Sequence, residues 1–188
     1  MSDIRIARDP DTSPDVLEQL ATHNRSSVRR SVAGNPTTPA PTLDALVRDV
    51  SWRVRLAAAA NPNTSIAGLT TLAADTSEAV RTRVARNPNA PVAMLMTLGG
   101  DERWQVRARV ARNRNAPAAV LTVLASDEKW YVRRTVAKHP NTPRKVLTAL
   151  ADDMHRDVRI AALRALTQHT RRPIGNIQII RERRWPPF

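Results

Sequence analysis

The stretch Val80-Arg-Thr-Arg-Val-Ala-Arg-Asn-Pro-Asn-Ala-Pro91, followed by Leu95-Met-Thr-Leu98, decides the fold of this chain, because its parts recur at a fixed spacing. The Val-Arg pair returns every 26 residues, at 28–29, 54–55, 80–81, 106–107, 132–133 and 158–159. Pairs of leucines keep the same period: Leu17/Leu20, Leu43/Leu46, Leu69/Leu72, Leu95/Leu98, Leu121/Leu124 and Leu147/Leu150. A period of 20–50 residues is typical of a solenoid, in which each unit packs on its neighbours. The sequence therefore predicts one elongated all-α array of about six two-helix repeats.

The first helix of a repeat is visible in residues 49–74. Asp49 is a suitable N-cap, and residues 51–60 follow it with buried positions at helical spacing. Asn61 precedes Pro62, and a residue before proline is disfavoured in the α region. We therefore expect the first helix to end at this Asn-Pro corner.

The second helix of the repeat is short. Residues 63–65 supply a second capping signal, and Leu69 and Leu72 then occupy one face. In other repeats Thr38-Pro39 and Thr142-Pro143 predict a capping threonine with proline at the first helical position. A helix of about two turns is unstable alone, so packing between repeats must stabilise it.

Composition excludes several classes of protein. The 188 residues include no Cys, which rules out disulfides and thiolate sites and makes a cytoplasmic location the default expectation. The chain shows neither a signal peptide nor an apolar stretch long enough to span a membrane. We expect a monomer that neither binds membranes nor acts on a small-molecule substrate.

The net charge of +13 comes from 27 Arg and 3 Lys against 17 acidic residues, and it is unevenly distributed. Residues 1–78 carry a net charge of −1, residues 79–145 carry +10, and residues 146–188 carry +4. The guanidinium group suits phosphate and carboxylate better than an ammonium does. The second half is therefore the expected binding region for an anionic partner.

The arginines of the Val-Arg pairs are expected to be structural. They lie at the edge of the buried face, and five of the six follow an aspartate by six residues. This pattern predicts an Asp–Arg ladder that ties adjacent repeats together. The arginines are Arg29, Arg55, Arg81, Arg107, Arg133 and Arg159, and the aspartates are Asp49, Asp75, Asp101, Asp127 and Asp153.

A second set of cations lies three and six residues after the valine, on the helix face opposite the core. Because stacked helices lie about 8–10 Å apart, these side chains should form a continuous basic ridge, which the first half lacks. The alternative is an ordinary solvated face. The candidate residues are Arg83, Arg86, Arg109, Arg112 and Lys138, with Arg164 further on and Arg114 and Arg134 nearby in sequence.

Trp52, Trp104 and Trp130 share one repeat position, two residues before the valine, and Tyr131 adjoins the last of them. Aromatic side chains beside arginines suit the stacking of nucleic-acid bases, so Trp104 and Trp130 join the candidate site. Residues of this kind more often seal the contact between repeats, and this second interpretation is the favoured one.

The repeat Val-Arg-x-x-Val-Ala-x-Asn-Pro-Asn-Ala-Pro with Leu-x-x-Leu resembles the leucine-rich repeat variant family over about residues 4–166. The resemblance implies a right-handed superhelix in which α-helices alternate with short 3₁₀ helices. Some members of that family carry an iron–sulfur module held by Cys, and this chain lacks those ligands. The last unit, residues 153–166, has lost the Asn-Pro corner and resembles a HEAT-repeat second helix.

The ends depart from the repeat. We expect a half-repeat cap at 1–16, a solenoid over 1–166, and a basic tail at 167–188 whose residues 174–180 dock partly on the last repeat. Gly99-Gly100 replaces residues with better helix propensity and predicts the weakest junction between repeats.

The function expected from these patterns is binding rather than catalysis. The four histidines lack metal-ligand spacing, and nothing predicts a cofactor or a metal. HEAT-like DNA glycosylases use Trp and Asp in a groove, but the aspartates here occupy repeated capping positions. The favoured function is a module that binds nucleic acid (DNA or RNA) without sequence preference. The alternative is a protein–protein interaction scaffold for an acidic partner or peptide.

Overall fold

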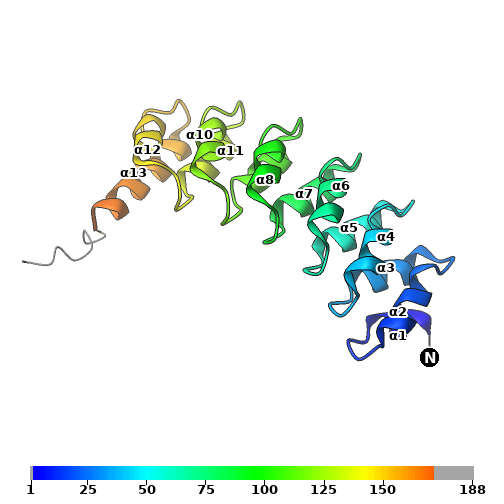
Figure 1. Cartoon of the computed structure of the whole chain (residues 1–188). Helices are drawn as coiled ribbons and strands as arrows, with labels where there is room; N and C mark the ends of the chain where they lie inside the picture. Colours follow the sequence, from blue (N-terminus) through cyan, green and yellow to red (C-terminus); the bar gives the residue numbers. More distant parts are fainter. Residues whose placement is uncertain (1, 172–188) are drawn as a thin grey trace, which may run out of the picture.

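The computed structural model describes residues 2–171 and contains thirteen α-helices and no strand in that part of the chain. The helices stack into a long, curved array rather than a globule (Figure 1). The predicted all-α solenoid is therefore confirmed. No helix within residues 2–171 is both long enough and apolar enough to cross a bilayer.

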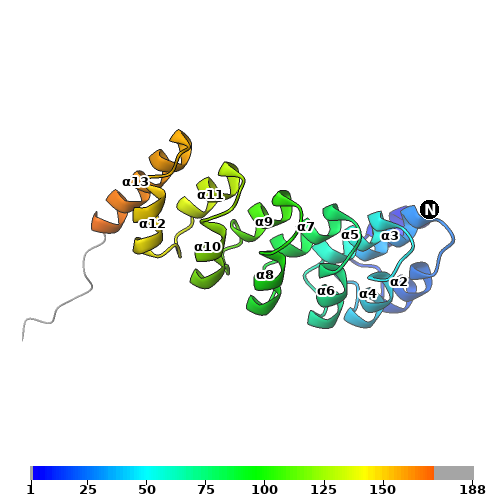
Figure 2. The ribbon, with the colours of Figure 1, turned by 90° about the horizontal axis from the view of Figure 1, so that it is seen from above.

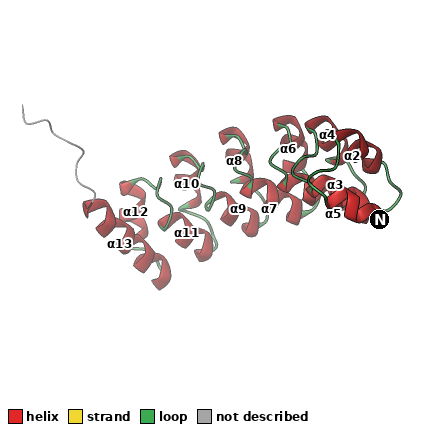
Figure 3. Cartoon of the chain, turned by 90° about the horizontal axis from the view of Figure 1, so that it is seen from below, coloured by secondary structure: helices red, strands yellow, loops and turns green. Residues whose placement is uncertain are grey.

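The helices form two rows that lie side by side along the array (Figures 2 and 3). Helices of the Val-Arg row contain the Val-Arg pairs or occupy the equivalent positions: α1 (Asp3–Arg8), α3 (Ser26–Gly34), α5 (Trp52–Ala60), α7 (Glu78–Arg86), α9 (Trp104–Val110), α11 (Trp130–Ala137) and α13 (Arg156–Arg171). Helices of the Leu row contain the leucine pairs: α2 (Pro14–Ala21), α4 (Ala40–Leu46), α6 (Ile66–Ala73), α8 (Val92–Leu98), α10 (Ala118–Leu124) and α12 (Arg144–Leu150).

The core is the thin layer between the two rows. In the repeat that opens the sequence analysis, Val80, Val84 and Ala85 come from one row, and Leu95 and Leu98 come from the other. All five side chains are buried. Because small β-branched residues face leucines throughout, the rows approach closely and each repeat is stabilised mainly by its neighbours.

The predicted capping role of Asp49 is wrong. Helix α5 begins at Trp52, and Ser51 occupies the N-cap position. Asp49 lies two residues earlier, where its Oδ1 accepts a hydrogen bond of 2.8 Å from the backbone N–H of Ser51. The aspartate thus shapes the turn that leads into the helix, while both of its oxygens also accept hydrogen bonds from Arg29.

The Thr-Pro sequences also act differently from the prediction. Pro39 itself occupies the N-cap position of α4. Thr38 points back, and its hydroxyl donates a 2.6 Å hydrogen bond to the carbonyl of Val32. Thr142 and Pro143 repeat this arrangement. The threonine therefore closes the corner between the two helices instead of capping the second one.

The Leu-row helices are α-helices, so the 3₁₀ alternation implied by the resemblance does not appear within residues 2–171. Bonds between residues three apart, as in a 3₁₀ turn, close the ends of these helices, for example where the backbone N–H of Arg48 donates to the carbonyl of Ala45 at 3.2 Å. The second capping signal is borne out in α6, because Ser65 accepts a 2.9 Å hydrogen bond from the backbone N–H of Gly68.

The Asn-Pro corners carry hydrogen bonds across the junctions between repeats. The buried amide of Asn61 donates to the carbonyls of Ala33 and Asn35, at 2.9 and 2.8 Å. Its oxygen accepts from the backbone N–H of Asn63 at 2.9 Å. One side chain therefore satisfies three backbone groups that would otherwise be unpaired.

His139 replaces this asparagine in the last corner. Its Nδ1 faces the backbone N–H of Asn141 at 3.1 Å and must accept, so its Nε2 donates to the carbonyl of Asn113 at 2.9 Å. The two bonds fix the neutral tautomer. Burial lowers the pKa of His139 and outweighs the hydrogen bond to Asn113, which raises it.

Gly99 has a packing role that the sequence did not reveal. A Cβ atom built at this position would lie 2.5 Å from Cγ2 of Val120 in the next Leu-row helix. The missing side chain therefore lets α8 and α10 approach at this junction. Low helix propensity alone does not explain this glycine, although the predicted weakness of the junction remains to be measured.

The C-terminal helix extends past the expected end of the solenoid. Helix α13 runs continuously through residue 166 to Arg171. The docking expected for residues 174–180 lies outside the described residues.

Candidate anion-binding face

Arginines of two kinds lie on the same helices, and the first kind is fully occupied. Arg81 donates through Nε and Nη2 to both carboxylate oxygens of Asp101, at 2.6 and 3.1 Å. Its Nη1 donates to the backbone carbonyl of Asp75 at 2.8 Å. Only 11% of the Arg81 side chain is exposed, so this guanidinium has no room for an external ligand.

The same arrangement joins five successive pairs of repeats: Arg29–Asp49, Arg55–Asp75, Arg81–Asp101, Arg107–Asp127 and Arg133–Asp153. The predicted Asp–Arg ladder is therefore confirmed, with one refinement. The carboxylate belongs to the aspartate that follows the arginine in sequence, as Asp101 follows Arg81. The residue six positions before the arginine accepts a second bond through its backbone carbonyl, as Asp49 does from Arg55 and His23 does from Arg29.

The ladder lowers the pKa of four carboxylates. Burial raises the pKa of Asp101, but hydrogen bonds from Arg81 and from the backbone N–H of Arg103 outweigh it and hold the pKa below its ordinary value. The pKa values of Asp49 and Asp75 are lowered in the same way. In Asp153 the hydrogen bond from the arginine is itself the largest influence, and the pKa is again lowered. These aspartates therefore remain charged when the chain is folded.

The second kind of arginine lies on the outward side of the Val-Arg row, which we call the cationic face. Surface depressions lie between its successive helices. Between α7 and α9 a depression of about 600 Å³ is bordered by Arg83, Arg86 and Arg109. The next, of about 410 Å³, collects four guanidinium groups: Arg86, Arg109, Arg112 and Arg114.

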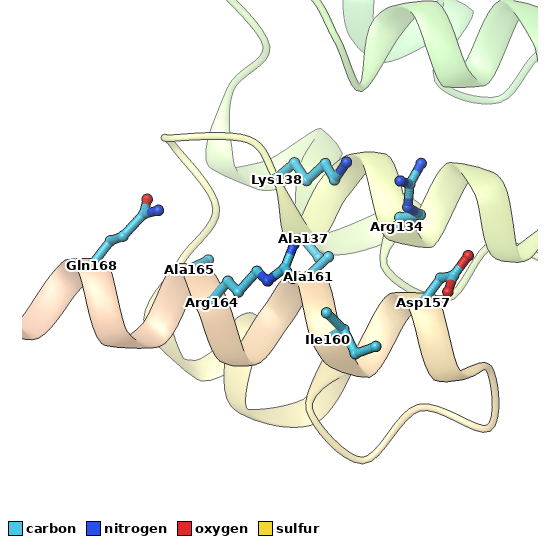
Figure 4. A pocket seen from close by; sticks show the side chains of 9 residues that line it. All are labelled: Arg134, Ala137, Lys138, Asp157, Ile160, Ala161, Arg164, Ala165 and Gln168. Atoms are coloured by element: carbon cyan, nitrogen blue, oxygen red, sulfur yellow. The ribbon is translucent and has the colours of Figure 1, made fainter.

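The cationic face continues towards the C-terminus. Arg112, Arg114, Arg134 and Lys138 border a depression of about 590 Å³ between α9 and α11. Another of about 450 Å³ lies between α11 and α13, where Arg134 and Lys138 project from one helix and Arg164 from the other (Figure 4). Neighbouring depressions share residues, so the cations follow one another without a gap.

These cations have no partner within residues 2–168. No carboxylate there lies within ion-pair distance of them, and their side chains make no hydrogen bond in that range. The linings described above contain only two acidic residues, Glu78 and Asp157. The structure therefore brings together the charged candidates of the predicted ridge: Arg83, Arg86, Arg109, Arg112, Arg114, Arg134 and Lys138.

The prediction that the first half lacks such a ridge is wrong. Arg8, Arg30 and Arg53 border a depression of about 350 Å³ together with Arg83, on the same row of helices. The repeat register contained the signal, since Arg8 occupies the same repeat position as Arg86. The net charge of −1 over residues 1–78 concealed these cations, because it counts acidic groups on other surfaces.

The tryptophan candidates do not join the cations. Trp104 packs edge-on against Tyr131, with ring centroids 5.7 Å apart, and Trp130 stacks on His155 at 4.1 Å. Trp130 also meets Tyr131 edge-on at 5.9 Å. This chain of rings spans three repeats, which agrees for Trp104 and Trp130 with the favoured interpretation that the tryptophans seal the repeats. Trp52 instead lies under the guanidinium of Arg53, 4.8 Å from its ring centroid. Only Tyr131 also borders one of the basic depressions.

The described residues hold no group of three His, Cys, Asp or Glu side chains placed to bind a metal ion. What the cationic face can do chemically is to bind anions along its length.

Comparison with known proteins places these features in a family context. The sequence model described as leucine rich repeat variant matches residues 52–77 and 130–154. The fold is similar to the solved structure of "a leucine-rich repeat variant with a novel repetitive protein structural motif", with a TM-score of 0.66 and 29% identity over 88% of this chain and 73% of that one. The predicted resemblance is therefore confirmed. No curated protein matches the sequence.

An engineered protein of known crystal structure is also similar, with a TM-score of 0.50 and 18% identity over 90% of this chain and 97% of its own. At that identity the match concerns the fold alone.

Proposed function

We propose that this solenoid, built from repeats of the leucine-rich repeat variant type, is a binding module that holds nucleic acid along its cationic face, without sequence preference. The observation that carries the proposal is the contrast between two sets of arginines. The five ladder arginines from Arg29 to Arg133 are each paired with a carboxylate within the fold, whereas the cations that border the depressions have no internal partner within residues 2–168.

The arrangement favours a polymeric anion over a single small one. The cations extend over α7, α9, α11 and α13, and they spread across shallow depressions instead of converging on one enclosed site. A phosphate backbone presents regularly spaced charges along its length, and its contacts position a protein without reading sequence. Among the residues that the structure describes, Tyr131 is the one Trp, Tyr or Phe side chain that borders these depressions, which gives little scope for base recognition.

A second candidate function is a scaffold for an acidic protein or peptide. The repeat fold supports it, since solenoids present extended surfaces to partners. Carboxylates would also pair with guanidinium groups. We favour nucleic acid because the cationic face continues unbroken over several repeats and so matches a long line of charges.

The test measures binding of a labelled DNA duplex and a labelled single-stranded RNA by fluorescence anisotropy at several salt concentrations. With about four to six phosphate contacts, the logarithm of the duplex affinity should fall with the logarithm of salt at about −0.9 per contact. Replacing Arg83, Arg86, Arg109 and Arg112 together by Gln should abolish most of the binding and flatten this slope.

The matched control removes the same charge from other surfaces. Arg5, Arg25, Arg103 and Lys129 are exposed and border none of the depressions described above. Replacing these four by Gln should leave the salt slope unchanged. Equal losses in both variants would mean that only net charge matters. Failure to bind either nucleic acid at low salt would overturn the proposal and favour the acidic protein.

A further inference from the structure

The Leu row exposes a surface of very different character on the other side of the array. Helices α6, α8 and α10 contain no charged residue at all, although the chain carries 47 charged side chains of Lys, Arg, Asp and Glu. Their outward positions are 66–67 and 70–71, 92–93 and 96–97, and 118–119 and 122–123, all of them exposed. We call these positions the uncharged face.

The uncharged face is apolar at its most exposed points. The exposed fractions of Ile66 and Val123 are 63% and 65%, and those of Val92 and Met96 are 54% and 42%. The threonines between them donate their hydroxyls to backbone carbonyls four residues earlier, as Thr122 does to Ala118 at 2.8 Å. The uncharged face therefore contains few unpaired hydrogen-bond donors, so a partner that buries it would leave few polar groups without a hydrogen bond.

Charges return on both sides of the uncharged face, with opposite signs. Helix α4 carries Asp44, which shares a 2.6 Å hydrogen bond with the hydroxyl of Ser65 and remains partly exposed. Helix α12 carries the exposed Arg144 and Lys145. Since α4 and α12 are each two Leu-row helices away from α8, the five helices themselves carry one acidic residue at one end, no charge in the middle and two basic residues at the other end.

We propose that the uncharged face is the interface for a second copy of this chain, arranged antiparallel about a twofold axis that passes beside α8. A twofold interface pairs each surface patch with itself in reverse order. The reversal brings α4 of one copy opposite α12 of the other, so at each end Asp44 comes level with Thr148 and lies one helical turn from Arg144 and Lys145. A parallel arrangement would instead place Lys145 near its own copy, which like charges oppose.

The residues that follow these helices fit the same arrangement. Arg48 follows α4 and Asp152 follows α12, both of them exposed and at equivalent repeat positions. A twofold axis parallel to the helices brings these opposite charges together as well. The region from α4 to α12 presents four outward positions on each of five helices, about the 20–30 residues per side of a standard interface.

This dimer replaces the monomer expected from the sequence, and it does not depend on nucleic-acid binding. The cationic faces of both copies would point away from the interface, because they lie on the other row of helices (Figures 2 and 3).

The first experiment measures the mass of the full chain by sedimentation equilibrium between about 1 and 200 μM, the range in which a weak dimer forms. Met96→Arg places two like charges near the axis and should weaken dimerisation at least about tenfold. Met154→Arg is the matched control, because Met154 is exposed at a corner between the rows. Circular dichroism should be unchanged in both variants.

The second experiment uses complementary charge reversals. Asp44→Lys makes both ends of the interface basic, and Arg144→Glu with Lys145→Glu makes both ends acidic. Each variant alone should dimerise more weakly than the natural chain, whereas an equimolar mixture should restore a dimer that contains one chain of each kind.

Three results would overturn the proposal. They are a natural chain that stays monomeric at about 200 μM, a dimer that Met96→Arg leaves intact, and a mixture that stays monomeric. Dimerisation that appears only after removal of residues 172–188 would also overturn it, in favour of the chain's own C-terminal segment as the occupant of the face.

Discussion

Arg81 and Arg83 lie two positions apart on α7 and have opposite roles. Arg81 lies at the edge of the row, where both oxygens of Asp101 and the carbonyl of Asp75 use its donors. Arg83 lies on the outward side, where it borders two depressions and makes no ion pair within residues 2–168. An arginine on this row therefore stabilises the repeats where a carboxylate of the next repeat pairs with it, and it remains available to a ligand where no such carboxylate lies within reach.

The first prediction tests that comparison on one helix. Arg81→Gln should lower the free energy of unfolding by about 3 kcal/mol, because it leaves Asp101 buried and charged without its partner. Arg83→Gln should change it by no more than about 0.5 kcal/mol, as is usual for exposed positions. Urea denaturation followed by circular dichroism measures both.

Affinity for nucleic acid, measured under conditions in which both variants are folded, should change in the opposite variant. Arg83→Gln weakens binding, and Arg81→Gln leaves it unchanged. Equal stability of the two variants would mean that the ladder contributes nothing beyond the packing of the valines and leucines.

The second prediction concerns acid. In the folded chain the pKa values of Asp49, Asp75, Asp101 and Asp153 lie below the ordinary value, so the unfolded chain binds more protons near that value. The stability that these carboxylates contribute is therefore complete above about pH 4 and is lost as the pH falls through their folded pKa values.

Thermal unfolding at pH 2–5, the range in which these carboxyl groups titrate, should show this loss of stability in the natural chain. The variant that lacks Arg83, Arg86, Arg109 and Arg112 should lose stability to the same extent. Asp101→Asn should show a shallower loss, because one of the four groups no longer titrates. A profile that changes with the outward arginines would contradict the assignment of the ladder as the acid-sensitive element.

The third prediction, with the smallest expected effect on stability, concerns His139 at the corner that follows α11. His139 is neutral in the folded chain with a lowered pKa, so the unfolded chain gains a proton first as the pH falls below about 6.5. Stability at this junction should decline slightly over that range and level off below the folded pKa. His139→Asn restores the residue of the other corners and should remove the dependence, which hydrogen exchange of the backbone N–H groups at 136–142 measures.

Periodicity predicted the fold well, because each repeat position has one environment. The Val-Arg and leucine pairs identified both rows of helices and the core between them. The same periodicity could not identify the partner of each ladder arginine. Asp75 precedes Arg81 closely in sequence and Asp101 follows it at a greater distance, and only the stacking of the repeats brings the second carboxylate into reach.

The candidate site was predicted in part, and its gaps have a physical origin. Arg83 and its equivalents follow from helical spacing. Arg30 and Arg53 were missed because they occupy outward positions that hold other residue types in most repeats. Stacking of the helices nevertheless brings these positions to the same depression. Trp104 and Trp130 were kept as site candidates beside the favoured sealing role because sequence spacing does not tell which side of a helix end faces the neighbouring repeat.

The ladder also determines how a chain of this kind can grow. Each repeat unit contributes one aspartate that receives the arginine before it and one arginine that reaches the aspartate after it. A copy of any such unit, inserted at the same register, would find both of its partners already in place. Duplication of the corresponding stretch of gene therefore lengthens the protein without the redesign of a ladder contact, and each added unit extends each row by one more helix.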